Sequence, residues 1–95
     1  MSAYMLVEIT VKDQALYDQY LEKIPGVIRK YKGHYILRSS RITPNSGGWT
    51  PDRIILMKFD TVAELRACFD SPEYKALGPM REQSTVTRSI MIEDE

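Results

Sequence analysis

The chain begins and ends in stretches whose side chains alternate between two sides of the backbone. In residues 4–10, Met5, Val7 and Ile9 share one side. In residues 85–93, the shared side carries Val86, Arg88, Ile90 and Ile92. A period of two residues is typical of β-strands. The pattern therefore predicts a strand at each end of the chain.

A three- and four-residue spacing replaces this alternation between Asp13 and Gly33. It predicts one long helix, with Asp13 as its N-cap and Gly33 as its C-cap. Pro25 and Gly26 lie inside it, and because proline removes a backbone donor we expect a bend near Ile24. The apolar positions on which the helix is predicted are Leu16, Tyr17, Tyr20, Leu21, Ile24, Val27, Ile28 and Tyr31.

The middle of the chain predicts a hairpin followed by a second helix. Residues 34–42 and 53–59 are rich in β-branched and aromatic side chains, as strands are. Between them, "TPNSGGWTPD" contains the proline, asparagine and glycine residues of a loop. Thr61 and Glu64 then form a capping box at the start of a helix that ends near residue 69.

The stretch "DSPEYKALGPMRE" predicts a further helical segment directly after the second helix. Ser71 can accept hydrogen bonds from free backbone N–H groups, and Pro72 suits the first helical position because it has no N–H to leave unpaired. Tyr74 and Leu77, followed by Met80 or Arg81, recur on one side. We expect that side to cover the edge of a sheet.

The order of the main elements is βαββαβ. It is typical of the ferredoxin-like α+β fold, in which an antiparallel sheet carries helices on one face. The chain has 95 residues and 43% hydrophobic content, enough for one modest core. Residues 1–95 are therefore predicted to form a single domain.

Helices on one face of the sheet would leave apolar side chains exposed on the other. We place Met5, Val7, Ile9, Ile55, Met57 and Phe59 on the helix side, and the uncovered face then carries Tyr4, Leu6, Ile36, Ile54 and Leu56. A patch of this kind marks an interface. A second copy is the simplest cover, and two sheets packed face to face would enclose a small barrel with a cavity.

Alternation also places charged side chains on the uncovered face, namely Glu8, His34, Arg38 and Lys58. Glu8 could pair with Arg38 or Lys58 to stabilise the dimer, or these groups could bind a ligand. The ordinary pKa of His34 is near neutrality, which suits a general acid or base. The planar fork of Arg38 suits a carboxylate, either from a substrate or from Glu8.

Four residues outside this group are further candidates for the site. Trp49 follows two glycines in the loop and could fold over the cavity mouth or anchor the neighbouring subunit. Arg53, Tyr74 and Arg81 could gather into a rim that attracts anions. The alternative is that the arginines lie at the surface and the tyrosine packs against the first helix.

Composition excludes several classes of protein. The net charge is zero and no basic run is present, which argues against nucleic-acid binding. The short apolar N-terminal stretch contains Glu8, so it predicts a strand rather than a signal or membrane segment, and a cytoplasmic protein. Cys68 is the single cysteine and is expected in the core with Tyr17 and Tyr20. No metal-ligand or phosphate-loop motif is present, so no cofactor is expected.

Three segments together resemble a known family. They are "VKDQALYDQYLEKIPGVIRKYKGHYILR", "GGWTPDRIILMKF" and "FDSPEYKALGPMR", and they resemble the domain of unknown function 1330 family of the dimeric α+β barrel superfamily. The resemblance implies a ferredoxin-like protomer and a homodimer. It implies no reaction, because the superfamily contains monooxygenases, isomerases, haem enzymes and plain ligand binders. Where family members usually have Gly-Gly, this chain has Gly33-His34 and Ser39-Ser40.

The leading interpretation is a homodimer that binds a small organic molecule, with an acid as one option, in a pocket on the uncovered sheet face. A cofactor-independent monooxygenase or isomerase is an alternative, in which His34 carries a proton and Arg38 holds an anionic group. A purely structural dimerisation module is a third. In that case the polar residues of the face would pair with one another.

Overall fold

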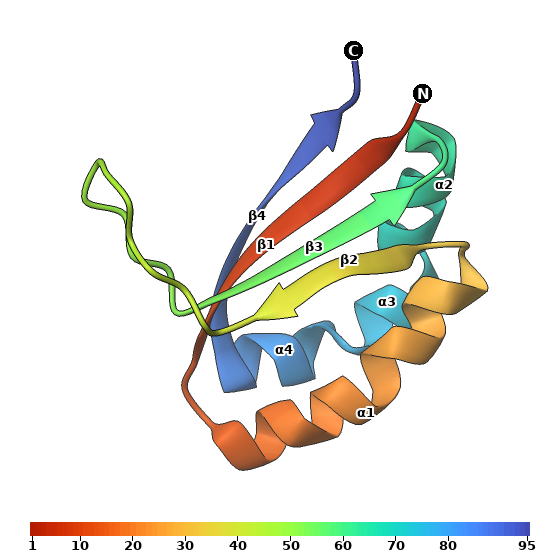
Figure 1. Ribbon diagram of the computed structural model, residues 1–95. Coiled ribbons are helices and arrows are strands. Elements are labelled where there is room, and N and C mark those ends of the chain that lie inside the picture. Colours follow the sequence, from red (N-terminus) through yellow and green to blue (C-terminus); the bar gives the residue numbers. More distant parts are fainter.

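The computed structural model describes residues 1–95, and its four strands form one antiparallel sheet in the order β2-β3-β1-β4. Figure 1 shows the helices on one side of this sheet. The predicted ferredoxin-like α+β fold is confirmed. The elements in chain order are β1 (Ala3–Val11), α1 (Gln14–Lys30), β2 (His34–Ser39), β3 (Arg53–Phe59), α2 (Val62–Phe69), α3 (Pro72–Ala76), α4 (Gly78–Ser84) and β4 (Thr85–Glu93).

The central strand β1 defines the two faces of the sheet. Val7 lies opposite Ile55 of β3 and faces the helices, whereas Glu8 lies opposite Arg88 of β4 on the other face. We call the face without helices the open face. The two termini lie near each other in Figure 1, where the backbone N–H of Asp94 donates to the carbonyl of Ser2 at 2.9 Å.

β2 is shorter than its sequence predicts. It ends at Ser39 instead of residue 42, so the loop to β3 includes residues 40–52. Figure 1 shows this loop extending well away from the sheet. Gly47 and Gly48 both have a positive φ within it, a conformation that glycine adopts without steric cost.

A bulge in β2 changes which side chains face the helices. The register with β3 shifts between Tyr35 and Leu37, so Ile36 is an extra residue. Beyond a bulge the side chains exchange faces. Arg38 therefore lies on the helix side, and the prediction that it shares a face with His34 is wrong.

α1 ends differently from the prediction. The helix stops at Lys30, and Lys32 rather than Gly33 takes the left-handed conformation, with φ at 69°. The N–H groups of Lys32 and Gly33 donate back to the carbonyls of Arg29 and Ile28 at 3.0 and 2.9 Å. This pair of hydrogen bonds is a Schellman motif.

Gly33 is required for packing. A Cβ atom at this position would lie 2.6 Å from the ring of Phe59 and 2.7 Å from the side chain of Ile28. Both neighbours are completely buried. The absence of a side chain therefore lets the turn between α1 and β2 pack directly on the core.

The remaining helix signals act as predicted. Asp13 accepts a hydrogen bond from the backbone N–H of Leu16 at 3.1 Å, and Thr61 caps α2 in the same way. The hydroxyl oxygen of Ser71 accepts from the N–H of Tyr74 at 3.1 Å and starts α3. α1 contains a proline, and Figure 1 shows that it changes direction along its length.

The core lies between the sheet and the helices. Tyr17, Tyr20 and Cys68 are buried in it, as predicted. Tyr74, Leu77 and Met80 pack against it from the segment that follows α2. The fully and largely buried apolar residues are Ala3, Ile9, Tyr17, Tyr20, Ile24, Ile28, Ile55, Met57, Phe59, Leu65 and Cys68.

Replacing Gly33 by Ala is expected to lower the free energy of unfolding by about 1–3 kcal/mol, because the new methyl group overlaps two buried side chains. Gly26→Ala is the matched control, since no atom lies within 4 Å of a Cβ there. In the middle of α1 it should raise stability by about 0.5–1 kcal/mol. Urea unfolding of both variants measures the difference, and equal stabilities would contradict the packing argument.

Candidate functional site

The sheet separates the predicted site residues into two groups. His34 and Lys58 lie opposite each other on the open face, together with Glu8. Trp49 reaches that face from the loop. Arg38, Arg53, Tyr74 and Arg81 lie on the helix side. One protomer therefore cannot bring both groups to a single site.

On the open face, Glu8 is fully engaged. One carboxylate oxygen accepts from the Nε of Arg88 and the other from the indole Nε1 of Trp49 at 2.9 Å. The hydrogen bonds from Arg88 and then Trp49 hold the pKa of Glu8 below its usual range. Within the protomer, Glu8 pairs with Arg88 and not with Arg38 or Lys58, because Arg88 stands opposite it and Arg38 faces the helices.

The open face is otherwise largely apolar. A hollow of about 290 Å³ lies beside Trp49, bordered by Leu6, Ile90 and the ion pair of Glu8 with Arg88. Half of the Trp49 side chain remains exposed. The exposed apolar residues of this face are Leu37 on β2 and Val86, Ile90 and Ile92 on β4, and Ile36 at the bulge is exposed as well. Those that are partly buried are Tyr4, Leu6, Ile54 and Leu56.

A second hollow, which we call the inner cavity, lies between α1 and the helix side of the sheet. Its volume is about 50 Å³. Arg38 from β2 and Arg81 from α4 are the charged side chains that line it. The other lining residues are mostly apolar or aromatic, namely Val7, Ile9, Tyr17, Tyr20, Leu21, Ile24, Ile28, Tyr35, Ile55, Met57, Phe69, Tyr74 and Thr85.

Each arginine of the inner cavity stacks on a tyrosine. The guanidinium of Arg38 lies 4.3 Å from the ring centroid of Tyr35, and that of Arg81 lies 4.8 Å from the ring centroid of Tyr74. Tyr74 in turn packs edge to face on Phe69. Such cation–π contacts fix the guanidinium planes without using their N–H donors.

Three tyrosines of the inner cavity, Tyr20, Tyr35 and Tyr74, stay protonated at neutral pH. Burial raises the pKa of Tyr35 to about 12. Burial also raises the pKa of Tyr20 and of Tyr74 above the ordinary value, although Arg81 acts in the opposite direction on both. These hydroxyl groups can donate hydrogen bonds to a ligand but are poor bases.

An outer cavity of about 240 Å³ adjoins the inner one, between α4 and the strands β1 and β4. Tyr74 and Arg81 line both cavities. Arg53 lines neither. It donates to the hydroxyl oxygens of Tyr17 and Ser40 at 3.2 and 3.1 Å, so the predicted rim contains Tyr74 and Arg81 without Arg53.

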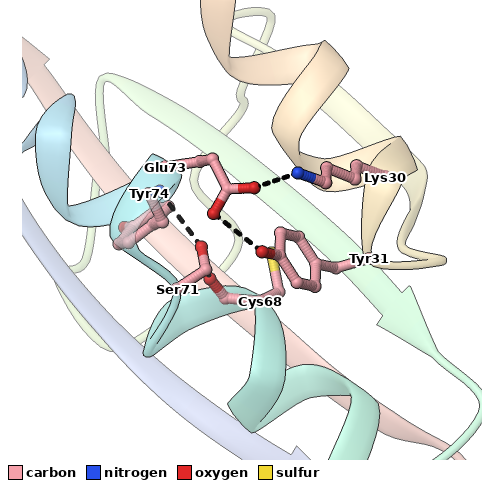
Figure 2. A network of polar contacts seen from close by, with 6 residues as sticks. All are labelled: Lys30, Tyr31, Cys68, Ser71, Glu73 and Tyr74. Atoms are coloured by element: carbon pink, nitrogen blue, oxygen red, sulfur yellow. Dashed lines mark hydrogen bonds and ion pairs between the residues drawn. The ribbon is translucent and has the colours of Figure 1, made fainter.

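The short helix α3 is tied to the end of α1 by Glu73. Figure 2 shows its carboxylate between the amine of Lys30 and the hydroxyl of Tyr31, which donates at 2.8 Å. Lys30 and then Tyr31 lower the pKa of Glu73 to about 2. Because Tyr74 follows directly in the chain, this contact holds Tyr74 in place at the cavity wall.

Metal and membrane sites are not indicated by the geometry. No three side chains among the histidine, cysteine, aspartate and glutamate residues converge to hold a metal ion. None of the helices combines the length and the apolar character needed to cross a bilayer.

Sequence reasoning missed Arg88, Tyr20 and Tyr35 as members of these sites. Arg88 was recognisable, because a ferredoxin-like order places the last strand beside the first and Arg88 shares a face with apolar neighbours. Tyr20 was predicted as a core residue, and it is buried. Its position at a cavity wall depends on how α1 packs, which spacing alone does not reveal.

Comparison with known proteins agrees with this architecture. The profile of the family described as "Domain of unknown function (DUF1330)" matches residues 2–94. No match was found among curated protein sequences.

Solved structures share the fold at low sequence identity. A dimeric ferredoxin-like protein of unknown function from Jannaschia sp. CCS1 has a TM-score of 0.76 at 16% identity, covering 99% of this chain and 100% of that one. A dimeric protein of unknown function and ferredoxin-like fold from Bacteroides fragilis has a TM-score of 0.64 at 15% identity, covering 98% and 96%. SnoaB, a cofactor-independent oxygenase from Streptomyces nogalater, has a TM-score of 0.72 at 6% identity, covering 99% and 93%.

Glu73→Gln is expected to lower the free energy of unfolding at pH 7. The folded-state pKa of Glu73 is depressed, so its contribution is fully present above the ordinary pKa of 4.5 and is lost as the pH falls toward 2. The stability gap between wild type and variant should therefore narrow over that range in acid. Thermal unfolding as a function of pH measures it. Glu22→Gln, an exposed change on α1, is the control, and a gap independent of pH would contradict the assignment.

Proposed function

The chain belongs to the DUF1330 family, and from this membership we propose that it is a homodimer that binds a small organic molecule between its sheet and its helices. The observation that carries the proposal is the inner cavity. It is an apolar space into which two stacked arginines and several protonated tyrosines project. Binding sites for small molecules have this composition, with a few polar groups on apolar walls.

The inner cavity supports binding better than the open face does. On the open face, both carboxylate oxygens of Glu8 are already engaged by Arg88 and Trp49. On the helix side, the Nη1 atom of Arg81 is buried without a hydrogen-bond partner. A ligand therefore gains more from the helix side, and Arg38, Tyr74 and Arg81 are the predicted site residues that we retain for it.

The open face supports the homodimer. Its exposed apolar residues lie on both edge strands of the sheet, β2 and β4. An apolar surface of this extent favours burial against a partner. Two of the structurally similar proteins are described as dimeric. In such a dimer Glu8, His34, Trp49 and Lys58 would lie at the interface, and a cytoplasmic location stays a prediction.

A cofactor-independent oxygenase is the second candidate, favoured by the fold shared with SnoaB. The predicted proton carrier His34 lies across the sheet from the inner cavity. Burial raises the pKa of Tyr20 and of Tyr35 above the ordinary value, to about 12 for Tyr35. A proton-transfer step in the inner cavity would therefore lack a base that works near neutral pH, and this favours binding over catalysis.

A purely structural dimerisation module is the third candidate. It explains why Glu8 on the open face is paired with Arg88 and Trp49 of the same protomer. It does not explain why buried donors of Arg81 face a cavity on the other side. Detection of a bound small molecule would favour the leading proposal over this candidate, which predicts none.

Ile90→Lys is expected to convert the homodimer into a monomer, weakening self-association about 100-fold or more because it places a charge in an apolar interface. Ile90 is a good choice because it is 56% exposed in the protomer, so the fold should survive. Ala67→Lys, on the exposed side of α2, is the control. Light scattering after size-exclusion chromatography reads the mass, and a monomeric wild type would refute the dimer.

Native mass spectrometry of freshly purified protein is expected to show a small retained mass on each protomer. Val7→Phe should remove it, because Val7 lines both cavities and the larger ring fills the space. Val11→Phe makes the same change on the same side of β1 outside both cavities. Once the molecule is identified, a concentration of 100 times its Kd should stabilise wild type by about 2.7 kcal/mol. If the Val7→Phe variant still retained the small mass, the molecule would bind outside these two cavities, which would contradict the proposed site.

A further inference from the structure

The inner and outer cavities share a wall. The residues that line both are Val7, Phe69, Tyr74, Arg81 and Thr85. Arg81 is the one charged member of this wall. The inner cavity beyond it is mostly apolar, whereas the outer cavity is also lined by hydroxyl groups of β4. A molecule that spans the wall would meet an apolar environment on one side and a polar one on the other.

One terminal nitrogen of Arg81 has no acceptor in the protomer. Its Nη1 atom is buried and has no partner, and the ring of Tyr74 covers one face of the guanidinium. A buried cationic donor without an acceptor has lost its hydration without compensation. Glu82 is the one acidic residue that lines either cavity, and it forms no ion pair with Arg81. An acceptor from outside the protomer would complete this site, and a negatively charged one suits a guanidinium best.

Tyr20 and Arg81 lie next to each other in the wall of the inner cavity. The guanidinium of Arg81 lies beside the buried hydroxyl of Tyr20. Burial keeps that hydroxyl protonated, because its pKa is raised above the ordinary value of 10.0. Two donors of this kind match the two oxygens of a carboxylate, and the planar fork of an arginine suits the same geometry.

The inner cavity limits what else the ligand contains. Ile24, Ile28 and Met57 line it, so the part that enters is hydrocarbon. Its volume of about 50 Å³ is small beside the roughly 150 Å³ of an apolar cavity that binds benzene. A chain of a few carbon atoms fits this space, and an aromatic ring does not.

From these observations we infer that the ligand is a short-chain monocarboxylic acid, with its carboxylate on Arg81 and Tyr20 and its hydrocarbon tail in the inner cavity. The inference rests on the proposed function, because it names the class of molecule that the same cavity takes. The outer cavity then serves as the polar entrance, from which the carboxylate reaches Arg81 without crossing apolar walls.

Butanoate and its neutral isostere butanamide are the probes. Each is titrated at pH 7 into protein labelled for NMR at methyl groups and arginine side chains. Butanoate should bind about tenfold more tightly than butanamide, because a charge-assisted hydrogen bond is stronger than a neutral one. The methyl signals of Ile24 and Met57 should shift with both probes, and the side-chain N–H signals of Arg81 should shift more with butanoate.

Two substitutions assign the preference to Arg81. Arg81→Met should bring the affinities for butanoate and butanamide to within about twofold, whereas Arg81→Lys should keep part of the difference because it keeps the charge. Arg66→Met, on the exposed side of α2 and outside both cavities, should leave the preference unchanged. If Arg81→Met fails to fold, Arg81→Lys and the two probes on wild type still decide the question.

The outcomes distinguish this inference from the proposed function. Equal binding of the two probes, with shifts at Ile24 and Met57, would overturn the carboxylate while leaving the cavity as a binding site. Shifts at Arg81 without shifts at Ile24 and Met57 would overturn the placement of the tail. No shift in either cavity would overturn the acid altogether. In that case native mass spectrometry of wild type and Val7→Phe would still test the proposed function.

Discussion

The whole architecture depends on a sheet that is apolar on both faces. A four-stranded sheet can bury one face under its own helices, and here it does so with Ile55, Met57 and Phe59. The opposite face keeps Ile90 and Ile92 in contact with water. Hydrophobic burial is the main favourable term in folding and association. The alternation of apolar residues along the strands therefore accounts for both the internal core and the proposed association of two protomers. One face packs against the helices, and the other is available to a second protomer.

The fold could be predicted from the sequence because its signals are local and agree with one another. Asp13, Thr61 and Ser71 cap their helices as their side chains suggest, and Pro72 opens the third. The order of strands then follows from the ferredoxin-like topology. Where a prediction was wrong, a tertiary contact determined the local conformation instead of the residue preference on which the prediction was based. Gly33 seemed to supply a left-handed cap, but Lys32 takes that conformation and Gly33 makes room for Phe59.

The candidate site was predicted less well, and a single residue accounts for much of the difference. Strict alternation in β2 would place Arg38 beside His34, and the bulge at Ile36 moves Arg38 to the opposite face. No residue type marks the bulge, since its sequence reads as a regular strand. The guanidinium of Arg81 stacks on the ring of Tyr74, although the two residues lie on separate helices, α4 and α3. Their relation to a cavity depends on the packing of α1, which is a property of the assembled molecule.

The pairing of the first strand with the last has a consequence for how the protein is made. β1 lies between β3 and β4, and Ala3 stands opposite Glu93. The central strand therefore lacks one neighbour until residues 85–93 have left the ribosome. Contacts between residues so distant in sequence slow folding, because a long loop must close before they form. Until β4 arrives, the unpaired edge of β1 is open to other strands, so the last nine-residue strand both completes the sheet and ends the period in which the nascent chain is most prone to aggregate.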